Sequence, residues 1–274
     1  MLKRFLTLSL IGLLSACGGG SDSDFNPSIS GIRVQSLRYG QTAVIDLAGQ
    51  FMRNDMVADT GTCTNPSFTA ASTPDHAVLN CKVTATGPLP ITIKSAAGAV
   101  LFTSTLTVLQ PQVTLITSKG NIVMALNADL VPTTVDNFLS YVRSGFYQST
   151  LFHRVIAGFV VQGGGYTTGL VKKTGQLAPI VLESKKGLLN TRSTVAMART
   201  NVSDSATSEF FVNLVDNPAL DYQSEANPGY AVFGKVVQGM DVVDKIAAVP
   251  TATSNGFSDV PISDVTIQFA VQIQ

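Results

Sequence analysis

The sequence predicts a mainly β protein that is divided into two folded parts, and three observations support this prediction. Most of the chain consists of short runs rich in Val, Ile, Leu and Thr, separated by Gly, Pro, Asn and Asp as strands are separated by turns. Only residues 131–145 and 239–249 carry apolar side chains at helical spacing. Gln110-Pro111 interrupts the strand pattern, and because proline restricts the residue before it, this dipeptide predicts a linker between the two parts.

The composition limits the class of protein. A chain of 274 residues fits one or two domains, and its 45% hydrophobic and 13% charged residues are enough for a buried core and too apolar for a disordered chain. The 18 Lys and Arg residues balance the 18 Asp and Glu residues, so the chain lacks the basic excess that attracts a phosphate backbone. We therefore expect no nucleic-acid partner.

Residues 1–16 are predicted to be an export signal. Lys3 and Arg4 precede the apolar run of residues 5–14, which is too short to span a bilayer but suits the core of a signal peptide. The letters LSAC that follow resemble a bacterial lipoprotein signal, in which the cysteine is acylated and becomes the first residue after cleavage. This interpretation predicts a lipid anchor at Cys17. The alternative is an ordinary secretory signal with an incidental cysteine.

A chain exported in this way would be held at a membrane of the bacterial cell envelope and would face the periplasm. Gly18 rather than aspartate follows Cys17, which resembles the signals of lipoproteins routed to the outer membrane. Residues 17–28 are polar and rich in Gly and Ser, so they are predicted to be a flexible, lipidated tether.

Residues 29–109 are predicted to form a small β-sandwich. Their strand-like runs show no helical period and loosely resemble the immunoglobulin-like modules of bacterial surface proteins. An even pair of cysteines in an oxidising compartment predicts a disulfide between Cys63 and Cys81, with two buried free thiols as the alternative. His76 stands alone in a polar loop and is expected to be a solvated surface residue.

Residues 112–274 combine further strands with both predicted helices. Two strand-like runs around Ser-Lys-Gly-Asn predict a hairpin over residues 113–126. Pro132 suits the first turn of the first helix, and Gly145 suits its C-terminal cap. A last strand is predicted over residues 264–274. Many strands with two helices far apart in the sequence favour a closed barrel with helices at its ends.

The residue types also limit the chemistry. The two histidines, His76 and His153, lie in different predicted domains, so the signal for the nucleophile and base of a hydrolase is poor. No cluster of His, Cys, Asp or Glu has the spacing of metal ligands. The glycines at 163–165 lack the following Lys-Ser or Lys-Thr of a phosphate loop and are expected to allow close backbone packing or special dihedral angles. We expect neither a metal nor a cofactor.

Four ordered segments carry a specific resemblance to a known family. They read FHRVIAGFVVQGGG (residues 152–165), TVAMART (194–200), SEFFVNL (208–214) and YAVFGKVVQGMDVVDKI (230–246). Together they resemble the signature segments of the cyclophilins, which are peptidyl-prolyl cis-trans isomerases. The resemblance covers residues 112–274 and implies an eight-stranded antiparallel β-barrel whose openings are covered by two helices.

This resemblance fits a chemistry that needs no acid, base or metal. The barrier to X-Pro isomerisation, about 18–20 kcal/mol, comes from amide resonance, which is lost as the bond twists. The twisted prolyl nitrogen regains a lone pair, so a charged donor beside it stabilises the transition state more than the planar ground state. By similarity Arg154 is that donor, and arginine suits the task because it stays charged and carries a rigid fan of N–H groups.

The resemblance also implies the substrate-binding residues. Gln162 and the backbone around Arg199 would hold the substrate chain. Ala198 would line its path, and Tyr230 would stand at the rim. His153 is expected to be a core histidine with a satisfied hydrogen bond. The pocket for the proline ring would be lined by four residues that, without the resemblance, would be assigned to an ordinary core: Phe159, Val160, Phe211 and Leu220.

Three positions depart from the pattern of the family. Val160 replaces a methionine that is common at the pocket, which is a modest change of shape. Ala219 falls where many eukaryotic members have a tryptophan, so the contact linked with strong cyclosporin binding is absent. Glu209 stands where the family usually has glutamine, beside Arg154, and could either hold the arginine in place or neutralise it.

The sequence therefore predicts a prolyl isomerase that acts during the folding of exported proteins, with proline-containing unfolded or partly folded chains as its partners. The alternative is a catalytically weak domain that binds proline-containing segments as a chaperone or scaffold. The intact Arg154 with its neighbouring motif residues favours the enzyme, whereas Glu209 and the missing tryptophan keep the alternative open.

Overall fold

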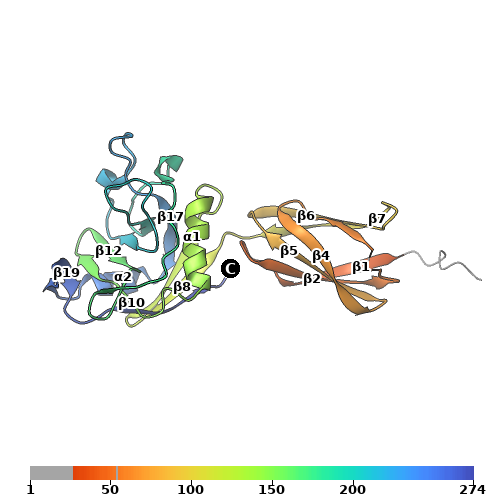
Figure 1. Cartoon of the computed structure of the whole chain (residues 1–274), viewed down its shortest axis with the longest axis horizontal. Coiled ribbons are helices and arrows are strands. Elements are labelled where there is room, and N and C mark those ends of the chain that lie inside the picture. The colour runs from red at the N-terminus through yellow and green to blue at the C-terminus, as the bar shows by residue number, and fades with distance from the viewer. Residues whose placement is uncertain (1–26, 54) are drawn as a thin grey trace, which may run out of the picture.

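The computed structural model of the protein describes residues 27–53 and 55–274, apart from the side chains of residues 70–73. The predicted signal, Cys17 and most of the predicted tether lie outside the described residues. Two β-rich units lie side by side along the long axis of the molecule (Figure 1). Among the helices of the described ranges, none combines the length and the apolar character needed to cross a bilayer.

The N-terminal unit consists of two antiparallel sheets, with the strand orders β1-β2-β5-β4 and β3-β6-β7. Burial alternates along the central strands because successive side chains point to opposite faces, and Ile45, Leu79 and Ile91 are almost fully buried. The likeness to immunoglobulin domains and the domain boundaries stay predictions. The strands are β1 (Ser28–Ser36), β2 (Thr42–Gln50), β3 (Val57–Asp59), β4 (Cys63–Thr73), β5 (His76–Val83), β6 (Gly87–Lys94) and β7 (Val100–Val108).

A disulfide joins two neighbouring strands of the four-stranded sheet. The sulfur atoms of Cys63 in β4 and Cys81 in β5 are 2.00 Å apart, and both residues are buried. His76, which we expected in a loop, is instead the first residue of β5. Its side chain is 44% exposed, and its Nε2 lies 3.9 Å from Oδ1 of Asp46. The histidine therefore lies at the surface, but beside a carboxylate that is far from it in the sequence.

The C-terminal unit is built on one curled antiparallel sheet with the order β10-β20-β8-β9-β17-β15-β16-β12-β11. Its two edge strands, β10 (Thr150–Leu151) and β11 (Arg154–Ile156), are separated in the chain only by Phe152 and His153, so the sheet curls and brings its edges together. The count of eight barrel strands stays a prediction. The other strands are β8 (Gln112–Thr117), β9 (Gly120–Leu126), β12 (Val160–Gly163), β15 (Thr194–Met197), β16 (Phe210–Asn213), β17 (Val232–Gln238) and β20 (Thr266–Gln272).

Both predicted helices are present, as α1 (Pro132–Arg143) and α2 (Met240–Ala247). The predicted apolar face of α1 is buried against the sheet. There the centroid of the Phe138 ring lies 4.9 Å from that of the Phe233 ring and 5.5 Å from that of the Phe210 ring. Two small hairpins were not predicted: β13 (Tyr166–Thr167) with β14 (Val171–Lys172), and β18 (Thr251–Ser254) with β19 (Phe257–Pro261). Short 3-10 turns at Ser184–Lys186 and Pro218–Leu220 were not predicted either.

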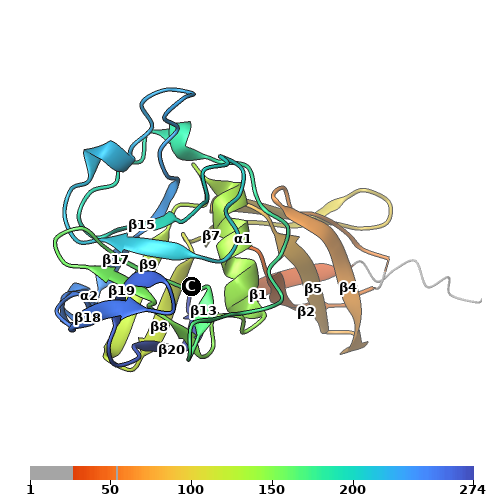
Figure 2. The same ribbon diagram turned by 60° about the vertical axis from the view of Figure 1, so that its left-hand side comes forward.

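An arginine at the end of α1 joins the two units by hydrogen bonds. Arg143, the last residue of α1, donates from Nη2 to the Tyr39 carbonyl oxygen at 2.7 Å. Its Nε and Nη2 also donate to Oε1 of Gln272, at 3.1 and 3.0 Å, and Gln272 donates to the same Tyr39 carbonyl at 3.1 Å. Burial lowers the pKa of Arg143, which Asp136 partly offsets. Figures 1 and 2 both place α1 on the side of its unit that faces the N-terminal unit.

A second contact lies where the chain passes between the units. Gln110 donates to Oδ2 of Asp129 at 2.5 Å and to the Thr86 hydroxyl at 3.1 Å, and its own Oε1 accepts from the Ala128 amide at 3.0 Å. The Thr86 hydroxyl also donates to Asp129. Two separate sets of hydrogen bonds therefore fix the orientation of one unit relative to the other.

Replacing Arg143 with alanine should lower the free energy of unfolding by about 2–3 kcal/mol, because three hydrogen bonds from a charged donor are lost. Urea unfolding should also separate into two transitions as the units come apart. Arg53→Ala is the control, since this 55% exposed side chain pairs with Asp55 at the surface, and its effect should stay below about 0.5 kcal/mol. A single transition at the wild-type midpoint for Arg143→Ala would show that the arginine does not fasten the units.

Candidate active site

Antiparallel pairing aligns a row of side chains across the C-terminal sheet. Arg154 on β11 is paired with Gln162 on β12. Gln162 is paired in turn with Phe211 on β16, and Phe211 with Ala196 on β15. Directly paired residues project from the same face of a sheet. The register therefore places a guanidinium, an amide and an aromatic ring side by side.

Next to this row the surface is hollowed into a pocket of about 190 Å³. Val160 and Phe211 are buried in its wall, and the Tyr230 ring stands edge-on to that of Phe211 with the ring centroids 5.5 Å apart. The guanidinium of Arg199 lies 4.8 Å from the centre of the Tyr230 ring. The pocket brings together nine residues that the resemblance assigned to the site: Arg154, Phe159, Val160, Gln162, Ala198, Arg199, Phe211, Leu220 and Tyr230.

Arg154 makes only long contacts and is 40% exposed. Its Nη1 lies 3.5 Å from Oε1 of Gln162, and its Nε lies 4.0 Å from Oδ2 of Asp259 on β19. Among the described residues no carboxylate comes closer to this guanidinium. Because arginine carries five N–H donors, most of its hydrogen-bonding capacity remains available to a substrate.

Glu209 does not pair with Arg154, which corrects the expectation that the two lie side by side. Its Oε2 accepts a hydrogen bond from Nε2 of Gln162 at 2.9 Å and lies 3.3 Å from Nε2 of His153. Gln162 stands between the two charges because the strand register places it opposite Arg154. Burial raises the pKa of Glu209, but hydrogen bonds from His153 and Gln162 outweigh it, so the pKa lies below its ordinary value.

His153 is a core residue, as predicted, but only part of its hydrogen-bonding capacity is used. The residue is 3% exposed, and its Nδ1 is buried with no hydrogen-bond partner among the described residues. Its ring lies 4.6 Å from that of Tyr166, which in turn meets the Phe257 ring at 5.1 Å. The missed hairpin of β18 and β19 therefore reaches the site twice, through Phe257 and through Asp259.

A buried network of asparagines holds the loops that form the pocket. Asn217 donates to the Phe159 carbonyl at 3.2 Å, and Asn190 donates to the Leu220 carbonyl at 3.0 Å. Asn213 links them by donating to Oδ1 of Asn190 at 3.2 Å while accepting from Asn217 at 2.8 Å. These asparagines were not predicted as part of the site. An asparagine inside the apolar run SEFFVNL was the available signal, since a polar side chain in a buried strand needs partners.

The three glycines lie where a side chain would collide, as the sequence analysis expected. A Cβ at residue 163 would lie 2.7 Å from the Leu151 carbonyl oxygen. Gly164 has a φ of +90°, which L side chains rarely adopt. A Cβ at residue 165 would lie 2.5 Å from Cγ of Glu209. The glycines therefore let this segment pass close to the Leu151 main chain and the Glu209 side chain.

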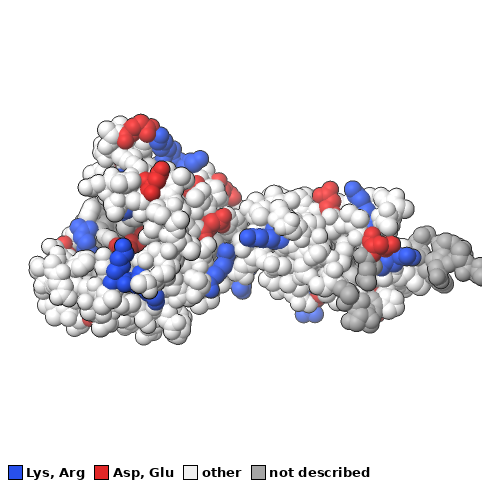
Figure 3. Space-filling model, in the orientation of Figure 1, with Lys and Arg blue, Asp and Glu red and all other residues white. Residues whose placement is uncertain are grey.

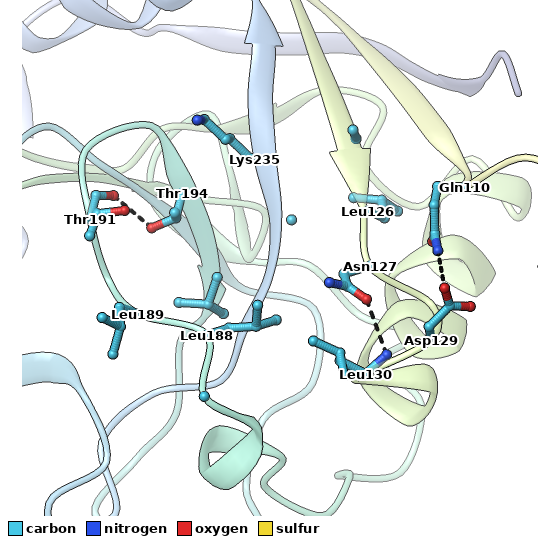
Figure 4. Close-up of a pocket in the computed structure, with 14 residues that line it drawn as sticks. Gln110, Leu126, Asn127, Asp129, Leu130, Leu188, Leu189, Thr191, Thr194 and Lys235 are labelled. Carbon is cyan, nitrogen blue, oxygen red and sulfur yellow. Dashed lines mark hydrogen bonds between the residues drawn. The ribbon is translucent and has the colours of Figure 1, made fainter.

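A larger hollow of about 760 Å³ lies elsewhere on the same unit, and its residues are drawn in Figure 4. Several of its polar groups bond to one another: Asn127 accepts from the Leu130 amide at 3.1 Å, and Thr194 donates to the Thr191 carbonyl at 2.7 Å. Much of the remaining wall is aliphatic. We therefore place the candidate active site at the smaller pocket, where a half-exposed arginine with spare donors adjoins an apolar wall.

The distribution of charge agrees with the balanced composition. Figure 3 shows Lys and Arg side chains scattered among Asp and Glu on the face drawn, with wide uncharged areas between them. The described residues contain no group of three or more His, Cys, Asp or Glu side chains that could hold a metal ion. The expected absence of a metal or cofactor stays a prediction.

Comparison with known proteins identifies the family of the C-terminal unit. Residues 112–271 match the family described as cyclophilin type peptidyl-prolyl cis-trans isomerase/CLD. The chain belongs to the cyclophilins. The match does not extend into the N-terminal unit.

The relatives of this cyclophilin match a little over half of the chain. It is 52% identical over 156 residues to peptidyl-prolyl cis-trans isomerase cyp18 of Streptomyces antibioticus, covering 56% of this chain and 93% of that protein. It is 51% identical over 158 residues to peptidyl-prolyl cis-trans isomerase B of Escherichia coli K12, covering 57% and 96%. A cyclophilin-type isomerase of Cryptosporidium parvum, crystallised in the presence of the dipeptide Ala-Pro, is 27% identical with a TM-score of 0.50, covering 60% of this chain and 99% of that chain.

Glu209 should make the stability of the cyclophilin domain depend on pH. Its folded-state pKa lies below the ordinary value of 4.5, so its carboxylate contributes stability that is present above this value and is lost as the pH falls through the folded pKa. The free energy of unfolding of the wild type, measured relative to Glu209→Gln by urea titration, should rise with pH from the folded-state pKa up to about the ordinary value of 4.5 and stay constant above it. If the difference in the free energy of unfolding between the wild type and Glu209→Gln does not change with pH below 4.5, the pKa of Glu209 is not lowered by folding.

Proposed function

We propose that this cyclophilin is a peptidyl-prolyl cis-trans isomerase that accelerates X-Pro isomerisation in exported proteins, with Arg154 as its catalytic donor. The observation that carries the proposal is the position of Arg154, whose half-exposed guanidinium makes only long contacts and lines an apolar pocket. Membership of the family and relatives named as peptidyl-prolyl cis-trans isomerases support the activity.

The chemistry follows from the two halves of the pocket. The proline ring of the substrate binds against the apolar wall of Phe159, Val160 and Phe211, while the preceding carbonyl swings through the open side. As amide resonance is lost, the prolyl nitrogen becomes pyramidal and accepts a hydrogen bond from Arg154. Because this acceptor is fully developed only in the twisted state, the arginine lowers the barrier more than it strengthens substrate binding.

The alternative function, binding without catalysis, requires that the charge of Arg154 be withdrawn from the substrate. Glu209 is the residue that raised this alternative. Its carboxylate is bonded to Gln162 and paired with His153, and the carboxylate nearest to Arg154 among the described residues is Asp259, at 4.0 Å. These contacts favour the enzyme.

The proposed location is the periplasmic face of the outer membrane, with a lipid anchor at Cys17. The sequence supports this location by a short apolar run after Lys3 and Arg4, small residues before Cys17 and a polar tether after it. An oxidising compartment also suits the disulfide between Cys63 and Cys81. At this location the substrates are exported chains whose folding is limited by the slow cis-trans isomerisation of X-Pro bonds.

Replacing Arg154 with alanine should reduce kcat/KM about 100-fold, which corresponds to about 2.7 kcal/mol of transition-state stabilisation. Arg154→Lys should recover little, because a single ammonium does not reproduce the planar fan of donors. A protease-coupled prolyl-peptide assay measures the rates, and circular dichroism checks the fold. Arg192→Ala is the control, since this 47% exposed arginine pairs with Asp244 away from the pocket. Near wild-type turnover in folded Arg154→Ala would overturn the mechanism.

Cys17 should carry the lipid anchor after cleavage behind residue 16. Mass analysis of protein extracted from membranes should show an acylated cysteine, Cys17, as the N-terminal residue. Cys17→Ser should move the protein from the membrane fraction to the soluble periplasmic fraction with its isomerase activity unchanged. An unmodified thiol at Cys17, or cleavage elsewhere, would refute the anchor.

A further inference from the structure

Three side chains connect Arg154 to the interior of the domain. Nη1 of Arg154 faces Oε1 of Gln162 at 3.5 Å. Nε2 of Gln162 donates to Oε2 of Glu209 at 2.9 Å, and the same oxygen lies 3.3 Å from Nε2 of His153. Glu209 is therefore the point at which two side chains converge, and one of them continues to the arginine.

The direction of these hydrogen bonds follows from the chemistry of the groups. An ionised carboxylate has only acceptors, whereas a glutamine amide has a donor end and an acceptor end that differ little in shape. Glu209 thus requires the NH₂ end of Gln162 to face it. The carbonyl end must then face the opposite way, towards Arg154, which has only donors. Likewise, Nε2 of His153 must carry the proton that points at the carboxylate.

We propose that Glu209 is a positioning residue for Arg154, which acts by fixing the orientation of the Gln162 amide and the tautomer of His153. The proposal rests on the proposed function, in which Arg154 is the catalytic donor. With its carbonyl oxygen towards the guanidinium, Gln162 attracts Nη1. With its amide reversed, it would present N–H groups to other N–H groups and push the arginine away from the place where the prolyl nitrogen twists.

The residue type at this position matters for the same reason. The resemblance to the family leads us to expect a glutamine here, and a glutamine can present either its oxygen or its nitrogen to Gln162. Two amides facing each other can reverse together, so both orientations of Gln162 remain possible. A carboxylate allows one orientation only. With Glu209, the Gln162 amide therefore has one orientation towards Arg154, whereas with a glutamine at position 209 it would have two.

The main chain beneath Glu209 contributes to its position. A Cβ at residue 165 would lie 2.5 Å from Cγ, 2.7 Å from Cδ and 2.7 Å from Oε1 of Glu209, so only glycine leaves room for this side chain. The φ of Gly165 is not in the left-handed region, so alanine fits its backbone and fails only on space. This contact offers a way to displace the carboxylate without changing its chemistry.

The experiment compares Glu209→Leu, which removes the acceptor, with Glu209→Gln, which leaves a reversible one, and Gly165→Ala, which displaces the carboxylate. Glu225→Gln is the matched control for the change in charge, because its side chain is 78% exposed and pairs with Lys185. Gly31→Ala is the matched control for an added methyl group, since its Cβ would meet no atom within 4 Å. Arg154→Ala is measured alongside.

Two readouts distinguish positioning from a structural role. NMR line shapes of a proline-containing peptide give the interconversion rate on the enzyme separately from the dissociation constant. In Glu209→Leu the rate should fall about tenfold while the dissociation constant changes less than about twofold, with Gly165→Ala intermediate and Glu209→Gln falling about two- to threefold. Nitrogen-15 shifts of His153 should report a proton fixed on Nε2 in the wild type and a mixture of tautomers in Glu209→Leu.

The outcomes separate this proposal from the one it rests on. If Arg154→Ala loses its activity but the folded Glu209 and Gly165 variants keep the wild-type rate, Glu209 does not position the arginine. A mixed His153 tautomer in the wild type would overturn the proposal as well, and this readout does not depend on the Leu variant folding. If Arg154→Ala keeps its activity, the proposed function fails first. A loss that appears only in the dissociation constant would assign Glu209 to substrate binding and overturn positioning.

Discussion

The pairing of β11 with β12 and of β12 with β16 is the constraint on which the rest of the site depends. It sets Arg154, Gln162 and Phe211 in one row. The strand register alone therefore places the charged donor, the amide and part of the apolar wall next to one another. A slip of one residue in this register would turn the side chains of one strand to the other face of the sheet. The close glycines at 163 and 165 and the asparagine network then hold the loops on either side of the row.

The electrostatics of the site follow from incomplete pairing. A carboxylate that is largely removed from water needs strong partners, and the Glu209 side chain, which is 25% exposed, bonds to Gln162 and lies beside His153. Arg154, by contrast, has a carboxylate only at 4.0 Å and an amide oxygen at 3.5 Å. The protein thus satisfies the anion inside and leaves the cation at the surface under-satisfied. A substrate atom that gains a lone pair finds a donor that does not first have to break a strong ion pair.

The sequence predicted the elements whose signal is local. The helix that begins at Pro132 and the hairpin of β8 and β9 follow from periodicity and turn residues. The nine pocket residues were named from the resemblance to the cyclophilins and not from any local pattern. What it did not predict depends on side chains far apart in the chain. Strand register sets the contact of Glu209 with Gln162, and His76 lies beside Asp46 on another strand. The hairpin of β18 and β19 meets the site through Phe257 and Asp259. No spacing rule within one segment carries that information.

The hydrogen bonds that join the two units also impose an order on assembly. The Tyr39 carbonyl and the Gln272 amide that bonds to it are 233 residues apart, and Gln272 is the last residue of β20. Synthesis begins at the N-terminus, so the N-terminal unit is complete before β20 is made. Domains generally fold as units during synthesis, the N-terminal one first. Until β20 is made, neither Arg143 nor the Tyr39 carbonyl has Gln272 as a hydrogen-bond partner. The contact of Tyr39, Arg143 and Gln272 is therefore the part of the junction that is completed last, after the one formed by Thr86, Gln110 and Asp129.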